Sequence, residues 1–364
     1  MTTTAVPAPG TASVARRLST LDRYLPLWIL AAMAGGLVLG RAVPTLGPAL
    51  DRLQVAGVSI PIAIGLLWMM YPVLAKVRYD AIGGHIKDGR LLGTSLLLNW
   101  VIGPMVMFTL AWLMLPDLPA YRNGLILVGL ARCIAMVLIW NDLACGSAEL
   151  AAVLVALNSL FQILTYSVLG WFFLSVVPGW LGAAGTALDV SMGGIARSVL
   201  IFLGIPLVAG WATRRILRRR RGDVWYDQVF LRRIGPTALL GLLYTIILMF
   251  AMQGERLLAH PFDVVRIALP LLIYFAVMFG AGFLLARRLG FGYPATASLA
   301  FTAAGNNFEL AIAVAVATFG LASGEAMAAA VGPLVEVPAL IALVYVALWA
   351  RRFFPAQPER TVRT

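Results

Sequence analysis

The sequence is poor in charge. Only 12% of its 364 residues are charged, against about 25% in soluble domains, while 61% are hydrophobic and mean hydropathy is +0.90. No Pro-, Gly- or Ser-rich linker and no long polar block marks a separate soluble domain. This composition excludes an ordinary soluble fold and predicts an all-α, polytopic membrane protein.

The sequence also lacks the residues that most enzymes and metal proteins need. Its two cysteines are too few for a disulfide framework or a four-ligand metal site. Its two histidines, His85 and His260, fall between apolar runs, so no Ser/His/Asp arrangement can be assembled. There is no H-E-x-x-H motif and no phosphate-binding loop. We therefore expect no enzymatic activity, no cofactor, no bound metal and no need for an ATPase subunit.

Positively charged residues are plentiful, but their distribution along the chain does not suit a protein that binds nucleic acid. The net charge is +12, and the basic residues sit in short loops between apolar runs. That pattern is a signal of membrane topology rather than a groove for phosphates. The polar ends, residues 1–20 and 354–364, are expected to be tails, the first of them disordered.

Ten apolar runs are long enough to cross a bilayer, whose core of roughly 30 Å needs about 20 helical residues. They divide into two sets of five, which gives a first repeat over residues 21–180 and a second over 181–353. The runs lie near residues 25–43, 57–75, 91–115, 121–140, 150–178, 193–213, 234–253, 264–286, 294–319 and 325–349.

The loops predict how these spans are oriented. The tails and even-numbered loops hold 21 Arg and Lys residues, the odd-numbered loops hold six, and Arg132 alone lies inside a span. Because such an excess marks the cytoplasmic side, we expect both termini in the cytoplasm and the chain in the inner or plasma membrane. The densest cluster, Arg214–Arg221, fits a cytoplasmic loop that anchors the topology; binding of lipid or a partner is the alternative.

Five helices per set means that the two halves enter the membrane from opposite sides. Inverted repeats of this kind are common in secondary transporters, whose site lies near the midplane and is formed by broken helices. Helix 9 shows its break at Gly305-Asn306-Asn307, poor helix formers inside an apolar span. Helix 4 offers only Gly129 as a local signal, so its break, and its crossing with helix 9, are inferred from the repeat.

The two halves match at one position of chemical interest. Moving Gly129-Leu-Ala-Arg-Cys133 forward by 176 residues places it on Gly305-Asn-Asn-Phe-Glu309, with glycine on glycine and thiol on carboxylate. The same shift takes Ala135 to Ala311. Cys133 by itself would be interpreted as a packing residue. A soft nucleophile and a titratable acid at matched mid-membrane positions instead predict a transport site.

Three ionisable residues lie inside spans, where each charge costs about 2.5–3.5 kcal/mol. Glu309 is interpreted as a proton carrier; the alternative is a carboxyl that stays protonated and bonds a neighbouring helix. Glu336, between Pro333 and Pro338, is the second proton candidate, or else it satisfies a kinked backbone. Arg132 needs a counter-charge from Glu309 or Glu336, either in proton coupling or in a purely structural pair.

Polar and aromatic side chains complete the candidate site. Asn158 and Asn307 are predicted to be buried amides that bind a small hydroxylated solute or, equally, another helix. Trp140, at the end of helix 4, is expected to anchor the chain at the membrane interface. Cys145 follows in a polar stretch and is expected in a loop. The motif Gly36-x-x-x-Gly40 allows close approach of a second helix.

Three segments are specific enough to carry a family resemblance. They read GLARCIAMVLIWNDLA at 129–144, ALNS at 156–159 and AAGNNFELAIA at 303–313. These segments resemble the ten-helix arsenite efflux permeases of arsenical resistance, in the bile acid/arsenite/riboflavin transporter group. The resemblance covers essentially all ten spans, and only the polar tails fall outside it.

The resemblance implies export of trivalent arsenic, and in some members antimonite, in exchange for protons. It implies that the helix 4 thiol and the helix 9 carboxylate, here Cys133 and Glu309, are essential. We therefore expect alternating access, with one reversible As–S contact at Cys133 and a proton taken by Glu309. The other positions that match ones the family uses are Arg132, Trp140, Asn158, Asn307 and Glu336.

The main alternative on the same architecture is a sodium-coupled symporter of bile-acid-like organic anions. It would need clustered oxygen ligands for sodium and a large amphipathic cavity, and the Cys/Glu pairing predicts neither. A structural or receptor role would leave the three mid-membrane charges unexplained.

Overall fold

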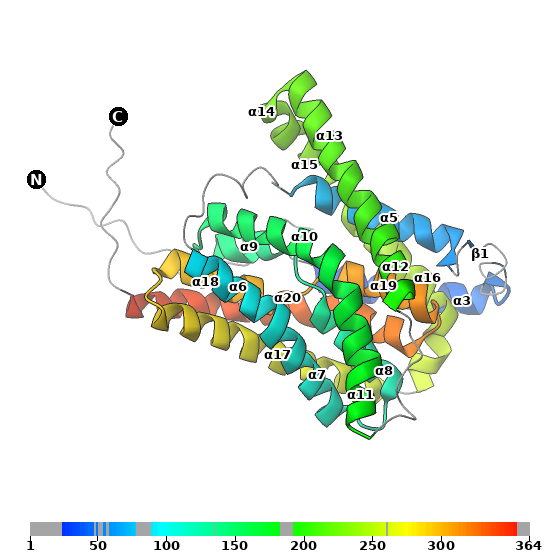
Figure 1. Ribbon diagram of the computed structural model, residues 1–364. Helices are drawn as coiled ribbons and strands as arrows, with labels where there is room; N and C mark the ends of the chain where they lie inside the picture. The colour runs from blue at the N-terminus through cyan, green and yellow to red at the C-terminus, as the bar shows by residue number, and fades with distance from the viewer. Residues whose placement is uncertain are drawn as a thin grey trace, which may run out of the picture.

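The computed structural model describes residues 24–46, 49, 54–55, 58–77, 89–134, 136–182, 192–259 and 261–354, and it is helical almost throughout (Figure 1). By length and composition, six of the described helices can cross a membrane, and shorter apolar helices accompany them. The prediction of a multi-pass helical membrane protein is confirmed, whereas the ten spans in two inverted repeats stay a prediction. His85 and His260 lie outside the described residues.

The helices follow one another with short connections. Strand occurs in the described residues only as a hairpin that pairs Gln54 with Ser59 and Val55 with Val58. Up to residue 182 the elements are α3 (Leu25–Ala42), β1 (Gln54–Val55), β2 (Val58–Ser59), α5 (Ile60–Ala75), α6 (Gly89–Leu97), η3 (Leu98–Ile102), α7 (Gly103–Met114), α8 (Pro119–Leu130), α9 (Met136–Leu143), α10 (Ala148–Trp171), η4 (Phe172–Val176) and α11 (Val177–Trp180). Beyond it they are α12 (Met192–Val199), η6 (Leu200–Gly204), α13 (Ile205–Arg221), α14 (Asp223–Trp225), η7 (Tyr226–Phe230), α15 (Leu231–Ile234), α16 (Thr237–Ala259), α17 (Pro261–Arg288), α18 (Tyr293–Ala304), α19 (Phe308–Phe319), α20 (Gly324–Ala350) and η8 (Arg351–Phe353).

Three long helical spans contain a π-helical turn just before a proline. The turn η3 precedes Pro104, η4 precedes Pro178, and η6 precedes Pro206. Proline lacks an N–H and its ring collides with the carbonyl oxygen four residues earlier. The wider π turn relieves that collision, so each span continues through its proline instead of ending there.

The helix α3 lies very close to α16, as the glycine motif predicts. A methyl group added at Gly40 would stand 2.1 Å from the carbonyl oxygen of Ala251, and one at Gly36 would stand 2.5 Å from that of Ile247. Only residues without a side chain permit this contact between the backbones of two membrane helices. The helix α16 also packs on α5, and α5 packs on α13, so these four helices form one group.

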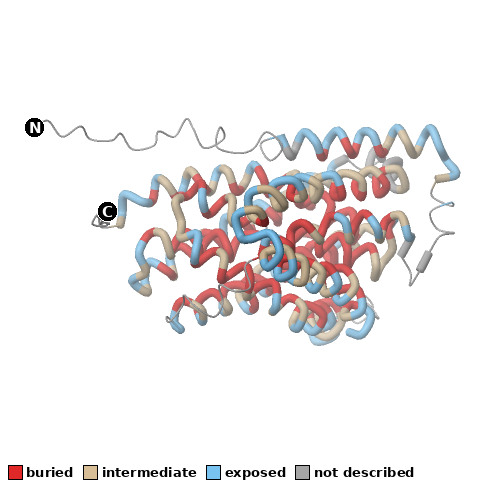
Figure 2. The backbone as a smooth tube through the Cα atoms, turned by 90° about the horizontal axis from the view of Figure 1, so that it is seen from above, coloured by how far each residue is buried: buried red, intermediate tan, exposed pale blue. Residues whose placement is uncertain are grey.

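The outer surface of the molecule is apolar. Leu113, Leu164 and Phe262 are each more than 70% exposed, and exposed segments run along the outside of the bundle while buried segments gather within it (Figure 2). Large exposed hydrophobic side chains are a liability in water but suit contact with lipid tails. The apolar outer surface therefore agrees with the membrane location that the composition predicts.

The arginine cluster Arg214–Arg221 is not in a loop, so that prediction is wrong. It forms the end of α13, which rises out of the bundle with α14 and α15 at its far end (Figure 1). Arginine is a good helix former, and the helix stops only at Gly222, which has a positive φ of 83°. Beyond it, Asp223 accepts hydrogen bonds from the Arg218 guanidinium at 2.5 and 2.6 Å.

Candidate functional site

Two helices are interrupted in the middle. One break separates α8, which ends at Leu130, from α9, which begins at Met136. The other separates α18, which ends at Ala304, from α19, which begins at Phe308. Both predicted breaks are therefore present, including the one in helix 4 that rested on the repeat.

The two breaks cross and pair with each other. Arg132 and Asn306 form an antiparallel bridge. The Cys133 N–H donates to the Gly305 carbonyl at 3.2 Å, and the Asn307 N–H donates to the Ala131 carbonyl at 3.1 Å. Backbone groups that leave a helix inside a membrane need partners from protein, and each break supplies them to the other.

The Asn306 side chain completes the end of α8. Its Nδ2 donates to the carbonyl oxygens of Val128, at 2.8 Å, and Ala131, at 3.2 Å. The last carbonyls of a helix lack their usual partners four residues on. Asn306 adds a second donor to each, beside the N–H groups of Ala131 and Asn307, and so stabilises the break in helix 4 from outside. On the other side, the Gln162 Oε1 accepts the Arg132 N–H at 2.9 Å.

The Cys133 thiol lies against the break of helix 9. Cys133 is only 3% exposed. A methyl group at Gly305 would stand 2.9 Å from the Cys133 Cβ and 3.5 Å from its Sγ. The glycine therefore makes room for the cysteine, and the thiol reaches the segment that leads into Glu309.

Glu309 lies in the first turn of α19 and is half-buried. Asn307 caps this helix by accepting the Leu310 N–H at 3.0 Å. The N-terminus of a helix carries partial positive charge, which favours an anion there. The crossing thus brings a thiol and a carboxylate to the same break.

Glu336 belongs to the same region, although it comes from α20. It is 5% exposed, its carboxylate faces the backbone N–H of Asn306, and Glu309 is near enough for the two carboxyl groups to interact electrostatically. Both Pro333 and Pro338 lie inside the continuous helix α20. Glu336 therefore approaches the break of helix 9.

Arg132 is fully buried, but the expected charge pair is absent from the described residues. Its Nη1 donates to the Tyr274 hydroxyl at 2.7 Å and to the Ala303 carbonyl at 3.5 Å, and no carboxylate lies within ion-pair distance of its guanidinium. The prediction that Glu309 or Glu336 pairs with Arg132 is therefore wrong. The reason is that a phenol and a helix-end carbonyl supply the acceptors instead.

Trp140 is fully buried, so the prediction of an interface anchor is wrong. It lies in α9, which packs inside the bundle just after the crossing. In the described part of the chain, the buried donors without a protein acceptor include three in or near the interrupted helices: the Trp140 indole N–H and the amide groups Nδ2 of Asn158 and Asn307. Buried donors normally have a partner, and such groups suit a solute rich in oxygen. Cys145 lies in the turn after α9, as predicted, with a positive φ of 57°.

Two residues that the sequence analysis missed hold the crossing. Gln162 accepts the Arg132 N–H and follows Asn158 by one helical turn, so a polar stripe on helix 5 could have revealed it. Tyr274 lies in the apolar helix α17 and gives no such signal. Among the described residues, no group of three or more His, Cys, Asp or Glu side chains is placed to hold a metal ion.

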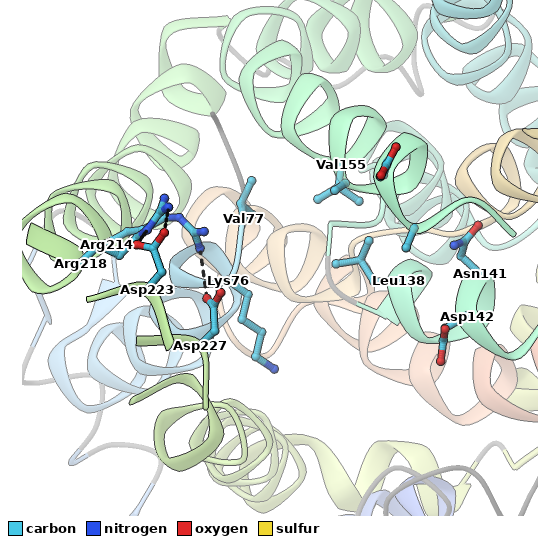
Figure 3. Close-up of a pocket in the computed structure, with 13 residues that line it drawn as sticks. Lys76, Val77, Leu138, Asn141, Asp142, Val155, Arg214, Arg218, Asp223 and Asp227 are labelled. Carbon is cyan, nitrogen blue, oxygen red and sulfur yellow. Dashed lines mark hydrogen bonds and ion pairs between the residues drawn. The ribbon is translucent and has the colours of Figure 1, made fainter. Parts of the chain in front are cut away.

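A cavity of about 690 Å³ opens beside α9, the helix that follows the crossing. Charged residues of α13, α14 and η7 line one side, and α9 and α10 form the other (Figure 3). Arg214 and Asp227 are 3.9 Å apart on the first side, while Asp142 and Glu149 are exposed on the second. The cavity lies between two groups of helices, and Leu138 and Asn141 of α9 are among the residues that line it.

Comparison with known proteins agrees with this architecture. The Sodium Bile acid symporter family matches residues 63–260. The chain is 54% identical over 343 residues to the arsenical-resistance protein Acr3 of Corynebacterium glutamicum, which covers 94% of this chain and 93% of the relative. It is 34% identical over 347 residues to the Acr3 of Alkaliphilus metalliredigens, with coverage of 92% and 94%. An uncharacterized transporter of Synechocystis is 37% identical over 362 residues, with coverage of 94% and 92%.

Identity of this extent over nearly the whole of each chain includes the interrupted helices and the surrounding bundle. The chain therefore belongs to the arsenite efflux permeases of arsenical resistance, within the Sodium Bile acid symporter family.

Proposed function

We propose that the chain exports trivalent arsenic, as arsenite, in exchange for protons. The observation that carries the proposal is the crossing of the two breaks, which brings the Cys133 thiol against the segment leading into Glu309. The names of the two arsenical-resistance relatives support the substrate. Antimonite, which has the same soft centre, is a second substrate on this proposal.

The proposed site binds arsenite through one sulfur contact and several hydrogen bonds. Arsenite in water is a small neutral trihydroxide with a soft centre that prefers sulfur, and Cys133 is the buried thiol at the crossing. The unpartnered donors of Asn307, Asn158 and Trp140 suit its hydroxyl oxygens. A single As–S bond keeps binding reversible, whereas three thiolates would hold arsenic too tightly for turnover.

Formation of the S–As bond at Cys133 releases the thiol proton, which Glu309 is proposed to accept and pass on. The S–H bond and one As–O bond break, an S–As bond forms, and the thiol proton passes through the carboxylate to the departing hydroxide, which leaves as water. On the external side, water hydrolyses the S–As bond, which restores the thiol and releases arsenite. The Glu309 carboxyl then takes up an external proton, which the empty carrier takes back to the cytoplasm, with Glu336 as the neighbouring proton site.

Access to the site alternates between the two sides of the membrane in this scheme. The 690 Å³ cavity is the proposed cytoplasmic entrance, because its basic residues Lys76, Arg214 and Arg218 follow spans whose loops are predicted to be cytoplasmic. Both termini then lie in the cytoplasm. Ten spans in two inverted five-helix repeats, over residues 21–180 and 181–353, account for crossing breaks at matched positions.

The sodium-coupled organic-anion symporter has less support. The family match includes such transporters by its description, but the relatives identified as resistance proteins are alike over nearly the whole chain. The two proposals differ in the ion they need. Transport that requires sodium and an organic anion would favour the symporter.

The thiol is tested by arsenite accumulation in everted membrane vesicles under an imposed proton gradient without sodium. For Cys133→Ser we expect initial uptake to fall at least about tenfold, because a hydroxyl cannot replace the sulfur bond. Cys145→Ser is the matched control and should transport normally, since that thiol lies in the turn after α9. Equal transport by the native chain and Cys133→Ser would rule out the sulfur contact.

The carboxylate is tested in the same vesicles. Glu309→Gln keeps the size of the side chain but cannot carry a proton, so proton-driven uptake should be abolished. Arsenite binding, measured without a gradient, should be weakened much less. Full proton-coupled activity in this variant would overturn the scheme.

A further inference from the structure

The buried cation at the crossing has no role in the transport cycle above. Arg132 is 0% exposed, and no ion pair involves it in the described ranges. Burying a charge without a counter-charge is costly, and Arg132 Nε and Nη2 lack any hydrogen-bond acceptor there. Two neutral oxygens, the Tyr274 hydroxyl and the Ala303 carbonyl, are the only hydrogen-bond partners of the guanidinium among these residues.

The position of the Arg132 guanidinium suggests that it takes the place of a bound cation. Ala303 is the next-to-last residue of α18, a half-helix that ends at the break. The carbonyls at a helix C-terminus carry partial negative charge. In transporters with broken helices, such half-helix ends and unwound carbonyls coordinate the coupling cation. Arg132 Nη1 therefore lies at a half-helix end of the kind that can bind a cation.

The surrounding helix leaves room for this guanidinium. A methyl group added at Gly103 of α7 would stand 2.7 Å from Arg132 Nη1 and 3.2 Å from the Tyr274 hydroxyl. The absence of a side chain at Gly103 thus creates the space in which the charge meets its two oxygens. Helix α7, helix α17 and the end of α18 together enclose it.

We propose that Arg132 is a tethered cation that fills the cation site at the end of α18, so this carrier binds no sodium there. A fixed positive charge repels a second cation at contact distance, and the coupling ion is left to be a proton. The match to a family described as sodium symporters makes sodium the relevant ion to test. The inference rests on the proposed transport site at the crossing, but not on arsenite being the substrate.

The test measures the apparent unfolding temperature of the purified protein in sodium chloride and in choline chloride at equal ionic strength, without arsenic. We expect no sodium effect for the native chain or for Arg132→Lys, which keeps a cation. For Arg132→Gln we expect a lower unfolding temperature in choline and a rise of about 2–4 °C in sodium. Because no transport is measured, the outcome does not depend on the arsenite proposal.

A second pair of variants keeps the test decisive should Arg132→Gln not fold. Arg132→Met also removes the charge but keeps a long, unbranched side chain in the space, and should show the same sodium stabilisation. Gly93→Ala lies in α6, where a methyl group meets nothing within 4 Å, and should stay insensitive. Sodium stabilisation of the native chain, or none in both Arg132→Gln and Arg132→Met, would overturn the proposal.

Discussion

The two breaks at the crossing look alike but are stabilised in different ways. The break between α18 and α19 contains residues that favour leaving a helix, Gly305, Asn306 and Asn307, and Asn307 caps the helix that follows. The break between α8 and α9 contains Ala131, Arg132 and Cys133, none of which disfavours a helix strongly.

The break in helix 4 is held open by its neighbours. Asn306 donates to the carbonyl oxygens of Val128 and Ala131, and Gln162 accepts the Arg132 N–H. One half of the crossing is therefore specified by its own sequence, and it imposes the conformation of the other half. Of two breaks that cross and pair in this way, only one needs to be encoded locally.

The largest effect is expected for Asn306→Ala, which removes both side-chain hydrogen bonds to the end of α8. Two buried carbonyls each lose one of two donors, so the free energy of unfolding should fall by about 1–3 kcal/mol for the two hydrogen bonds. Arsenite uptake should be lost with it, because Cys133 is positioned by that break. Chemical denaturation and vesicle uptake are the measurements.

The control for Asn306→Ala is Asn99→Ala. Asn99 is also fully buried, but it bonds only to Ser95 one turn earlier in its own span. Its loss should lower stability without abolishing uptake. If Asn99→Ala abolished uptake and Asn306→Ala did not, the break in helix 4 would not depend on Asn306.

A smaller effect is expected at the locally encoded break. Asn307→Ala removes the cap of α19 and should cost about 1 kcal/mol, whereas Asn307→Asp keeps the accepting oxygen and should retain most stability. Both variants lose the Nδ2 donor proposed to meet arsenite, so both should raise the KM for uptake. Ser323→Ala, which removes the cap of α20, should match Asn307→Ala in stability and leave KM unchanged.

The smallest effect is expected for an exposed ion pair just before the start of α8. Arg266 in α17 donates to Asp117 in the loop before α8, and this hydrogen bonding lowers the pKa of Asp117 to about 2. A carboxyl with a lowered folded pKa stabilises the fold above its unfolded pKa, near 3.9, and loses that effect as pH falls through about 2.

The unfolding temperatures of the native chain and Asp117→Asn should therefore differ slightly at pH 5–8 and converge as the pH falls from about 4 to 2. The difference should also shrink in high salt, because the pair is solvent-exposed. A difference that grew below pH 4 would contradict the role of this ion pair. Transport by Asp117→Asn near neutral pH should be unaffected, since this exposed pair is outside the proposed transport site.

Much of the site was predictable because periodicity and composition act locally. Apolar runs predict the helices of a membrane protein, and the comparison of the two halves relates Gly129 to Gly305 and Cys133 to Glu309. The glycine motif of α3 predicted its close approach to a partner helix. Each of these features depends on residues near one another in the chain or on one comparison between halves.

What could not be predicted depends on residues far apart in the chain. Arg132 was expected to meet a carboxylate, yet its partner Tyr274 lies 142 residues away in a helix with no distinguishing pattern. Trp140 was expected at the membrane surface because tryptophan is common there, but helix packing buries it. The arginines of α13 were placed in a loop because their charge marks a side of the membrane and says nothing of helix length.

The sequence by itself determined that this chain lies in a membrane, that it has a thiol and a carboxylate at equivalent positions, and that helix 9 is broken. Those features follow from composition, spacing and intrinsic helix propensity. Only the tertiary structure decided which side chain holds the break of helix 4, that Arg132 is held by neutral oxygens, and that Glu336 reaches the same segment. The physical reason is that buried polar groups must find partners, and distant segments supply those partners only once the helices have packed.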